Sequence, residues 1–533
     1  MRLLTTVAAL SCYLTKRHSE NKQAFPEDLV LDEMTSWYQT AVGLVPTMGA
    51  LHEGHLSLIE RARQENSTVI VSIFVNPLQF SPNEDLQRYP RTLELDIQLC
   101  KQAGVDVIFA PTPEELGIPQ KSIQESKVTQ VIPPSAMITG LCGGSRLGHF
   151  QGVATIVTKL FNLVQPDRAY FGQKDGQQLA IIRRLVADLN FPVEIVACPT
   201  VREVSGLALS SRNQYLTATE KEQAAVLYRS LQEAEAAFKA GVRNSNQLIE
   251  VVKQQVAMVS NVVVEYIELV EPSTLMSIEK VEEEAMLAIA ARLGSTRLID
   301  NIILCDRQPI IAIDGPAGAG KSTVARQVAA KLGLVYLDTG SMYRAVTWLV
   351  LQKGIAIDDE CAIAELAHKC EIQLTPSQDL QSPVQVWING TDVTQVIRSI
   401  EVTSKVSAIA AQSSVRKALV KQQQSWGKRG GLVAEGRDIG THVFPDAEVK
   451  IFLTASVSER ARRRQQDFKK QSQPEVSLEQ LERDIAERDW KDSSRKVSPL
   501  QKAADAIEIK TDGLSVAEVT TQIVNYCQQL LSR

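Results

Sequence analysis

Short apolar runs alternate with amphipathic runs along the first two hundred residues of the chain. The amphipathic runs repeat apolar positions every three or four residues, as in HLSLIERARQ and GQQLAIIRRLVADL. Continuous apolar strands separated by helices are typical of a parallel, doubly wound sheet that is covered on both faces. The pattern predicts an α/β domain over residues 1–202, with buried strands at 42–47, 68–75, 105–111, 168–172 and 193–201.

The pattern changes after residue 202. The run TATEKEQAAVLYRSLQEAEAAFKAG predicts one helix with a glycine stop, and VVVEYIELVEP predicts a strand. We therefore expect a small α+β subdomain over residues 203–304.

A second alternation of strands and helices begins at residue 309. PIIAID reads as a buried strand, and KSTVARQVAAKL reads as a helix that ends at Gly333. Four more apolar runs, LVYLD, GLVAEG, EVKIFL and AIEIKTD, continue the pattern. These runs predict a second α/β domain over residues 305–533.

Composition narrows the kind of partner. The chain has 533 residues, 44% of them hydrophobic, which suits more than one globular core. The net charge of −5 argues against a general nucleic-acid binder, and no apolar run approaches the length of a membrane span. The eight cysteines form no CxxC pair, which favours reduced thiols. We expect a cytoplasmic protein that acts on small molecules.

The stretch GPAGAGKST joins the first strand of the second half to its first helix. This spacing fits GxxxxGK[ST], a loop whose backbone N–H groups and following helix hold phosphates. A chance glycine-rich turn is the alternative, but it does not explain the strand before and the helix after. We predict an ATP site in which Lys321 is catalytic and contacts the β- and γ-phosphates, Ser322 offers a hydroxyl to Mg²⁺, and Gly315, Gly318, Gly320 and Thr323 complete the loop.

Polar side chains follow other strands of this half, where open α/β sheets bind ligands. Arg344 and Arg437 carry forked donors suited to a phosphate, and Asp438 can accept from an exocyclic amine. The basic run at 460–470 fits a solvated face, a nucleic-acid patch or a lid over a transferring phosphoryl group. We favour the lid.

Residues 309–533 resemble bacterial cytidylate kinase through GPAGAGKST, DTGSMYRA, GRDIGTHVFPDA and ERDWKDSSR. The resemblance implies a P-loop nucleoside monophosphate kinase fold and phosphoryl transfer from ATP to CMP or dCMP. It is weak over residues 374–390, where we expect no ligand contacts. By position, it implies a CMP site formed by Thr339, Arg344, Arg416, Arg437, Asp438, Arg488, Asp492 and Arg495.

In the first half, PTMGALHEGHLSLI places His52 and His55 three residues apart at the start of a helix. This spacing does not fit the zinc motif HExxH, and no third ligand is evident. Two capping or surface histidines are one alternative. In the other, the imidazoles and helix N–H groups donate to charge on phosphorus oxygens, and Gly54 lets the nucleotide approach closely. We favour the second reading, with chemistry at the α-phosphate of ATP.

Three further stretches, FVNPLQF, FGQKDGQQL and LALSSRN, follow strands of the same domain. Each alone also fits a turn or a surface loop. Together with PTMGALHEGHLSLI they resemble pantoate–β-alanine ligase (pantothenate synthetase), whose domain is a Rossmann-like member of the HIGH nucleotidyltransferase superfamily. The resemblance spans residues 3 to about 303.

This resemblance implies a two-step reaction, in which the pantoate carboxylate attacks ATP to give pantoyl adenylate and β-alanine then displaces AMP. His55 is the implied catalytic donor, and Gln79 and Gln178 would bind pantoate. One departure is Leu147 in RLGHF, where the family usually has proline, and another is the glycine-rich LCGGSR. The implied ATP site consists of Met48, Gly49, His52, Gly54, His55, Gly172, Gln173, Lys174, Asp175, Val201, Leu209, Ser210, Ser211 and Arg212.

Both halves together resemble the bifunctional ligase/cytidylate kinase arrangement of cyanobacteria. Adenylylation of another acceptor, such as a phosphopantetheine or nicotinamide mononucleotide, is one alternative, but Gln79 and Gln178 without a further phosphate pocket argue against it. A silent regulatory half is another, and loss of His55 or Lys321 would be its signature, yet both are present. We expect Mg²⁺ with ATP, no tightly bound organic cofactor, and a homodimer through the first half.

Overall fold

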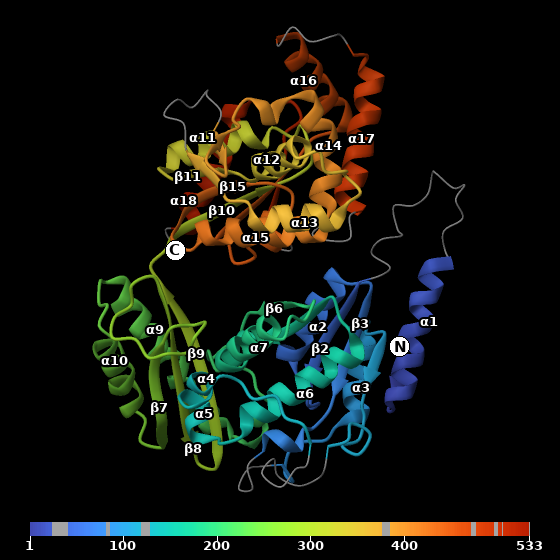
Figure 1. Cartoon of the computed structure of the whole chain (residues 1–533). Coiled ribbons are helices and arrows are strands. Elements are labelled where there is room, and N and C mark those ends of the chain that lie inside the picture. The colour runs from blue at the N-terminus through green and yellow to red at the C-terminus, as the bar shows by residue number, and fades with distance from the viewer. Residues whose placement is uncertain are drawn as a thin grey trace. The chain divides into compact units, whose positions relative to one another are not determined.

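The computed structural model describes residues 1–23, 41–80, 86–118, 128–375, 384–470, 476–494, 499–503 and 505–531. Contacts divide the chain into two compact units, Met1–Asp306 and Arg307–Arg533, whose elements are labelled in Figure 1. No helix within the described ranges is long and apolar enough to cross a membrane.

A six-stranded parallel sheet forms the centre of the first unit, in the order β1-β4-β3-β2-β5-β6. The five predicted strands are confirmed, although most are shorter than predicted. The edge strand β1 was not predicted, because it has three residues and two of them are exposed. The strands are β1 (Arg2–Leu4), β2 (Val42–Thr47), β3 (Thr68–Ile73), β4 (Val107–Phe109), β5 (Arg168–Gly172) and β6 (Glu194–Cys198).

Helices cover both faces of this sheet. Alternate residues of a strand point to opposite faces, so Val45 packs with the helices α2 and α3 while its neighbour Leu44 packs with α6 and α7. The predicted doubly wound α/β fold is therefore confirmed. The helices are α1 (Val7–Gln23), α2 (Glu53–Glu65), η3 (Pro77–Gln79), α3 (Leu93–Gln102), α4 (Ser135–Ile138), α5 (Leu141–Ser145), α6 (His149–Val164), η5 (Gln173–Asp175) and α7 (Gly176–Asp188).

The strand order creates a crevice at the carboxyl ends of β2 and β5. The chain runs from β2 outward to β3 on one side, whereas β5 pairs with the other side of β2. Loops that leave neighbouring strands in opposite directions open a binding crevice between them. The loop before α2 and the short helix η5 both begin at this edge, so two motifs distant in sequence meet there.

A small α+β layer completes the first unit, as the pattern after residue 202 predicted. The predicted helix over 217–241 is instead two helices that meet at Ala225. A capping box of Thr217 and Glu220 fixes the first, and the buried face of the second, including Leu231 and Phe238, fixes the other. The elements are η6 (Ser211–Tyr215), α8 (Ala218–Ala224), α9 (Val226–Lys239), α10 (Ser245–Ala257) and the antiparallel strands β7 (Val262–Val270), β8 (Glu284–Leu293) and β9 (Thr296–Cys305).

The second unit has a five-stranded parallel sheet in the order β11-β15-β10-β16-β17. All five predicted strands are present. They are β10 (Gln308–Asp314), β11 (Val335–Asp338), β15 (Gly430–Glu435), β16 (Val449–Thr454) and β17 (Ile507–Lys510).

Helices and a small antiparallel sheet surround these strands. The predicted helix over 321–332 is present with those ends, and Gly333 caps it in a left-handed conformation. The helices are α11 (Lys321–Leu332), α12 (Thr339–Gln352), α13 (Glu360–Lys369), η7 (Val396–Arg398), α14 (Ile400–Ala411), α15 (Ser413–Gly427), η8 (Ile439–Val443), α16 (Val457–Lys470), α17 (Leu478–Ser494) and α18 (Val516–Leu531), and the small sheet has β12 (Ile372–Thr375), β13 (Gln385–Ile388) and β14 (Thr391–Asp392).

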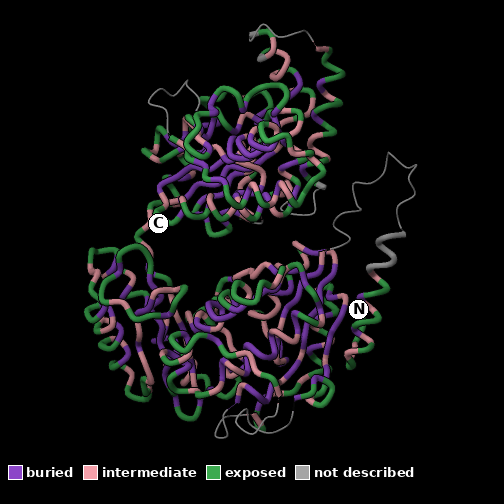
Figure 2. The backbone as a smooth tube through the Cα atoms, viewed as in Figure 1, coloured by how far each residue is buried: buried purple, intermediate pink, exposed green. Residues whose placement is uncertain are grey.

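Each unit has its own hydrophobic core. Figure 2 shows buried residues along the strands of both sheets. Among the described residues, the clusters of the first unit end at Leu304 and those of the second begin at Ile310. Separate cores are the physical basis of independent folding.

We expect a chain that ends at Asp306 to fold alone, because its cluster residues lie within that unit. Thermal unfolding of this truncated chain should show one cooperative transition, within a few degrees of one of the transitions of the full chain. A molten or aggregated product would contradict independence of the two cores.

Candidate functional sites

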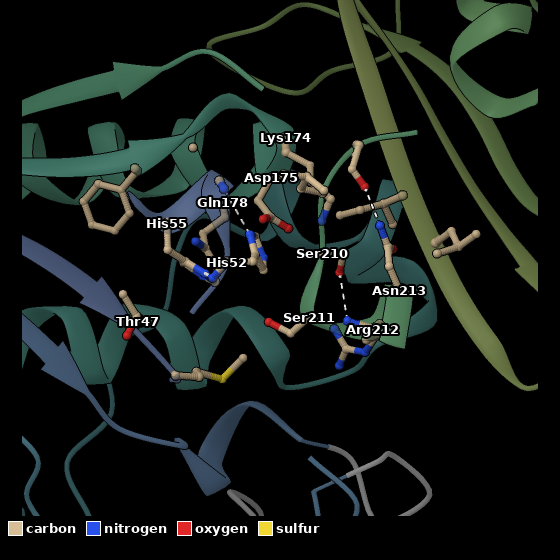
Figure 3. Close-up of a pocket in the computed structure, with 18 of the residues that line it drawn as sticks. Thr47, His52, His55, Lys174, Asp175, Gln178, Ser210, Ser211, Arg212 and Asn213 are labelled. Atoms are coloured by element: carbon tan, nitrogen blue, oxygen red, sulfur yellow. Dashed lines mark hydrogen bonds between the residues drawn. The ribbon is translucent and has the colours of Figure 1, made fainter. Parts of the chain in front are cut away.

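A cavity of about 580 Å³ opens at the predicted edge of the first sheet. Its walls come from the loops after β2 and β5, from α6, and from the segment Pro199–Asn213. Figure 3 shows His52 and His55 side by side, with Lys174, Asp175 and Ser211 around them. The predicted site residues of this half line the cavity, except Gly49 and Gln173.

Both histidines are built into the start of α2. His52 is the residue before the helix, and its Nδ1 accepts from the Gly54 N–H at 3.1 Å. The His52 N–H donates to Nδ1 of His55 at 3.4 Å, and the His55 N–H donates to the His52 carbonyl at 2.7 Å. These three N–H groups are therefore used within the cap, and the expectation that helix N–H groups face a phosphate is wrong for them.

This cap fixes the tautomer of each ring. A backbone N–H can only donate, so each Nδ1 must be unprotonated and each neutral ring carries its proton on Nε2. Burial and Lys174 lower the pKa of His52 to about 4, and burial with His52 and Lys174 lowers that of His55 to about 3. Both imidazoles are thus neutral hydrogen-bond donors near pH 7.

Gly54 has a second reason to be glycine. A Cβ there would lie 2.9 Å from Cε1 of His52, so any side chain would displace the capping ring. Gly54 also lines the cavity, and the close approach of a nucleotide to it stays a prediction.

A buried carboxylate holds the loop that leads into this cap. Asp96 of α3 is fully buried, and it accepts from the Ala50 N–H at 3.0 Å and from the Leu51 N–H at 2.8 Å. Gly49 belongs to the same loop and donates to the Thr47 hydroxyl at 3.2 Å. Gly49 therefore shapes the loop, and Asp96 is a supporting residue that the motif analysis missed.

At the other end of the cavity, three residues hold Gln79. The side-chain amide of Asn76 donates to the side-chain oxygen of Gln79 at 3.3 Å. The side-chain nitrogen of Gln79 lies 2.7 Å from the sulfur of Met48. His149 donates from Nδ1 to the Gln79 carbonyl at 2.7 Å. The neutral Nε2 of His149 is then free to accept from Arg146, 3.0 Å away.

His149 and Arg146 were missed as site residues, although RLGHF was singled out for Leu147. Burial and the neighbouring Arg146 hold the pKa of His149 well below its ordinary value, which keeps Nε2 an acceptor. Leu147 is 77% exposed and does not line the cavity.

The loop with LSSRN closes the cavity from the α+β side. Ser210 caps the short helix η6 by accepting from the Arg212 N–H at 3.3 Å. Ser211 donates to the Ala50 carbonyl at 3.2 Å, which ties this loop to the loop before α2. Gln178 and Lys174 reach the same space from α7 and η5.

In the second unit, the predicted P-loop connects β10 to α11. Gly315 has a φ of +145°, and a Cβ there would lie 2.1 Å from the Leu453 carbonyl oxygen, so only glycine fits. Gly320, also with positive φ, precedes α11, which starts at Lys321 and exposes Ser322 and Thr323. Lys321 is 6% exposed and donates to the Pro316 carbonyl at 2.7 Å.

Burial, with Arg437 nearby, holds the pKa of Lys321 well below its ordinary value. A buried ammonium that gains an anion regains its charged form. This loop is therefore prepared for a phosphate.

Two buried carboxylates lie beside the P-loop. Asp314 accepts from the Ile439 N–H at 2.8 Å and from the Gly440 N–H at 2.7 Å, and burial raises its pKa to about 6. Glu435 ends β15 and accepts from Tyr336 and from the Ser322 hydroxyl. Burial and Asp338 raise the pKa of Glu435.

Glu435 was not predicted as a site residue, because it lies at the end of the apolar run GLVAEG and precedes the charged residues of GRDIGTHVFPDA. A hydroxyl and a carboxylate oxygen are ligand types that Mg²⁺ prefers, so Ser322 and Glu435 fit a cation bound with a nucleotide. Among the described residues, no cluster of three or more His, Cys, Asp or Glu side chains could hold a metal without such a ligand.

The predicted CMP residues converge, and several already pair with one another. Asp438 forms a buried ion pair with Arg416, which is 2% exposed. Arg437 donates to Asp492 at 2.8 Å. The Thr339 hydroxyl donates to the Glu435 carbonyl at 2.7 Å.

The pKa of Arg488 reflects the charged residues around it in the predicted CMP site. Burial, followed by the neighbouring Arg437, Arg344 and Arg464, lowers the pKa of Arg488 to about 10, although Asp492 acts in the opposite direction. Converging cations disfavour one another until an anion neutralises them. The remaining predicted residue, Arg495, lies outside the described residues.

Two arginines of the basic helix α16 lie beside the P-loop. Arg460 is 4% exposed, donates to the Ala317 carbonyl at 3.1 Å and pairs with Asp489 at 2.6 Å. Arg463 donates to the Thr511 carbonyl at 2.7 Å. Both residues lie against the P-loop, since a Cβ on Gly318 would lie 3.3 Å from Cβ of Arg460 and one on Gly320 would lie 3.8 Å from the Arg463 guanidinium. The lid interpretation of the basic run stays a prediction.

Two parallel α/β sheets, one with a histidine-lined cavity and one with a P-loop, indicate a two-unit nucleotide-dependent enzyme. The family models "Pantoate-beta-alanine ligase" and "Cytidylate kinase" match residues 26–303 and 311–529. A bifunctional pantoate ligase/cytidylate kinase of Trichormus variabilis is 82% identical over 100% of both chains, and one of Trichodesmium erythraeum is 55% identical over 98% of this chain and 97% of its own. The chain belongs to the bifunctional pantoate ligase/cytidylate kinase family.

Solved structures match the first half. Pantothenate synthetase of Thermus thermophilus is 44% identical, covers 57% of this chain and 99% of its own, and has a TM-score of 0.49. A pantoate-β-alanine ligase of Francisella tularensis, in complex with an ATP compound and β-alanine, is 34% identical, covers 57% and 97%, and has a TM-score of 0.43.

We expect His52 and His55 to stay neutral, with the proton on Nε2, down to pH 5. Nitrogen NMR of labelled histidine, assigned with His52→Asn and His55→Asn, should show no titration of these rings near pH 6.5. Because the unfolded chain binds protons between pH 6.5 and about 4 that the folded rings do not, the free energy of unfolding of this unit should fall as the pH falls through that window. A normal histidine titration would contradict the cap.

Proposed function

We propose that the unit Met1–Asp306 joins pantoate to β-alanine with ATP, and that the unit Arg307–Arg533 phosphorylates CMP or dCMP with ATP. The ligase assignment rests on two neutral imidazoles at the start of α2, in a cavity that Lys174 and Arg212 also line. The P-loop beside an arginine cluster supports the second.

In the first ligase step, a pantoate carboxylate oxygen attacks the α-phosphorus and pyrophosphate leaves. Negative charge moves onto phosphorus oxygens, where donors placed in advance stabilise the transition state. The Nε2–H groups of His52 and His55 supply such donors, with His55 the principal one. Lys174 and Arg212 neutralise the departing pyrophosphate, and Gln79 and Gln178 hydrogen-bond pantoate.

In the second step, the amine of β-alanine attacks the acyl carbon, AMP leaves, and a proton is released. Pantoyl adenylate would also react with water, so the site must exclude water until the amine arrives. Apolar side chains of the cavity wall, including Phe74, Val153 and Ile156, support this role. Met48 and the backbone at Val201 and Leu209 complete the ATP site.

The kinase step transfers the γ-phosphoryl group to the CMP phosphate. Little covalent chemistry falls to the protein, so positioning and charge neutralisation dominate. Lys321 clamps the β- and γ-phosphates, Arg344, Arg437 and Arg488 hold the acceptor phosphate, and Asp438 with Arg416 reads the cytosine. Mg²⁺ bound with ATP at Ser322 and Glu435 would neutralise phosphate charge.

The remaining expectations belong to this proposal. We keep the limits 1–202, 203–304 and 305–533. Separate clusters support the division between the two units, near Asp306, whereas Val270, Leu275, Met286 and Ala288 pack into the core of residues 1–202. The enzyme works on small molecules in the cytoplasm, with Mg²⁺ as its one cofactor, and pairs as a homodimer through the ligase unit. Nothing in the family relationship favours another acceptor or a silent half.

Each activity should be separately removable. Lys321→Ala removes the ammonium at the phosphates and should lower CMP phosphorylation by orders of magnitude while pantothenate formation stays near wild type. His55→Ala should cut the ligase by about 10²–10³-fold, the typical effect of losing one donor to a developing oxyanion, and spare the kinase. Both activities are assayed on one preparation, and loss of pantothenate formation in folded Lys321→Ala protein would disprove two independent sites.

Asp438 should matter for CMP more than for ATP. Asp438→Asn keeps the volume but removes the charge that holds Arg416, so the Kd for CMP should rise by about 10- to 100-fold, as for a lost charged hydrogen bond. The Kd for ATP, measured by calorimetry on the same sample, should change less than threefold. Because the pair is buried, thermal unfolding is the control, and equal losses for both ligands would contradict the assignment.

A further inference from the structure

Two adjacent residues of β9, outside every motif, each hold one of the loops that line the ligase cavity. The side-chain amide of Asn301 donates to the Gln173 carbonyl at 3.1 Å and to the Lys174 carbonyl at 2.7 Å. Asp300, 3% exposed, forms a two-point ion pair with Arg202 at 2.6 and 2.9 Å. Asp300 also accepts from the Asn301 N–H at 2.9 Å, and this hydrogen bond connects the two side chains that hold the loops.

Asn301 fixes the backbone from which Lys174 reaches into the cavity. A lysine ammonium sits on a flexible four-carbon stem, so its position depends on how firmly its backbone is held. Gly176 shows how closely β9 and β8 approach this loop, because a Cβ there would lie 2.5 Å from the sulfur of Met286 and 3.3 Å from the Asn301 amide nitrogen.

Asp300 holds the other loop of the cavity wall, the one that contains Val201. Arg202 follows Val201, lies over the ring of Tyr228 at 3.5 Å, and donates to the Gly206 carbonyl at 3.2 Å. Val201 in turn accepts from the Leu209 N–H at 2.9 Å. The ion pair therefore anchors the turn that carries Val201 and Leu209, two residues of the predicted ATP site.

We infer that Asp300 and Asn301 are positioning residues of the ligase, which set the Lys174 loop and the Val201 wall relative to each other. They act through these loops, and the inference rests on the proposed role of Lys174 at the phosphates. A purely volumetric role for Asn301 is the competing account, and a change of charge without a change of size separates the two.

Asn301→Asp keeps the shape of the side chain but turns an oxygen toward two carbonyl oxygens. The kcat/KM for ATP in pantothenate formation should fall by about tenfold or more, since two donated hydrogen bonds are lost. CMP phosphorylation by the same preparation should be unchanged. Ile303→Ala, at a 48% exposed position on the same strand, is the matched control and should leave both activities unchanged. Ligase kinetics of Asn301→Asp within twofold of wild type would overturn the inference.

A double-mutant cycle tests the route through Lys174. Asn301→Ala should cost about tenfold in kcat/KM for ATP when Lys174 is present but less than threefold in a Lys174→Ala background, because coupled residues are not additive. Equal costs in both backgrounds would overturn the inference while leaving the role of Lys174 intact. Wild-type ligase activity of Lys174→Ala alone would instead contradict the proposed role of Lys174.

Discussion

In each unit, a buried carboxylate accepts two successive backbone N–H groups and so holds a loop of the proposed nucleotide site. Asp96 binds the N–H groups of Ala50 and Leu51, and Asp314 binds those of Ile439 and Gly440. A buried charge is costly unless it is fully hydrogen-bonded, so a carboxylate of this kind tolerates little displacement of its donors. The loops before α2 and after β15 are therefore held rigidly. The first loop leads to His52 and His55, and the second carries Arg437 and Asp438.

The two sites then differ as their chemistry requires. Attack at the α-phosphorus leaves pyrophosphate as the leaving group, and neutral imidazoles can donate to the reacting centre without adding charge beside Lys174. Transfer of a γ-phosphoryl group spreads charge over the outer oxygens. In the proposed kinase site, Lys321 and the cluster around Arg488 would supply the cations. Burial is the first cause of the lowered pKa of both His55 and Lys321. The consequences differ: the His55 imidazole stays neutral near pH 7, whereas the Lys321 amine would regain its charge when an anion binds.

Most strands and the motif residues could be predicted from the sequence, because buried parallel strands are continuous apolar runs and phosphate loops have fixed spacing. The break at Ala225 could not, since no glycine or proline marks it and packing of α9 decides it. Asp96 lies within an ordinary amphipathic helix, and its burial depends on a loop forty-five residues earlier. Asn301 acts through a loop 127 residues away. Such supports have no local signal, whereas Arg146 lies in RLGHF and Glu435 directly precedes GRDIGTHVFPDA, so both were open to prediction from the sequence.

We propose that one chain uses ATP in two ways: pantoate attacks the α-phosphorus in one unit, and CMP attacks the γ-phosphorus in the other. The most direct test is to supply pantoate labelled with ¹⁸O in its carboxylate, together with β-alanine, CMP and ATP labelled with ³²P at the γ-position. The account predicts one ¹⁸O atom in the phosphate of each AMP formed, seen by ³¹P NMR, and ³²P in CDP and pyrophosphate but not in AMP. AMP without ¹⁸O, or pantothenate formed in excess over AMP, would contradict it.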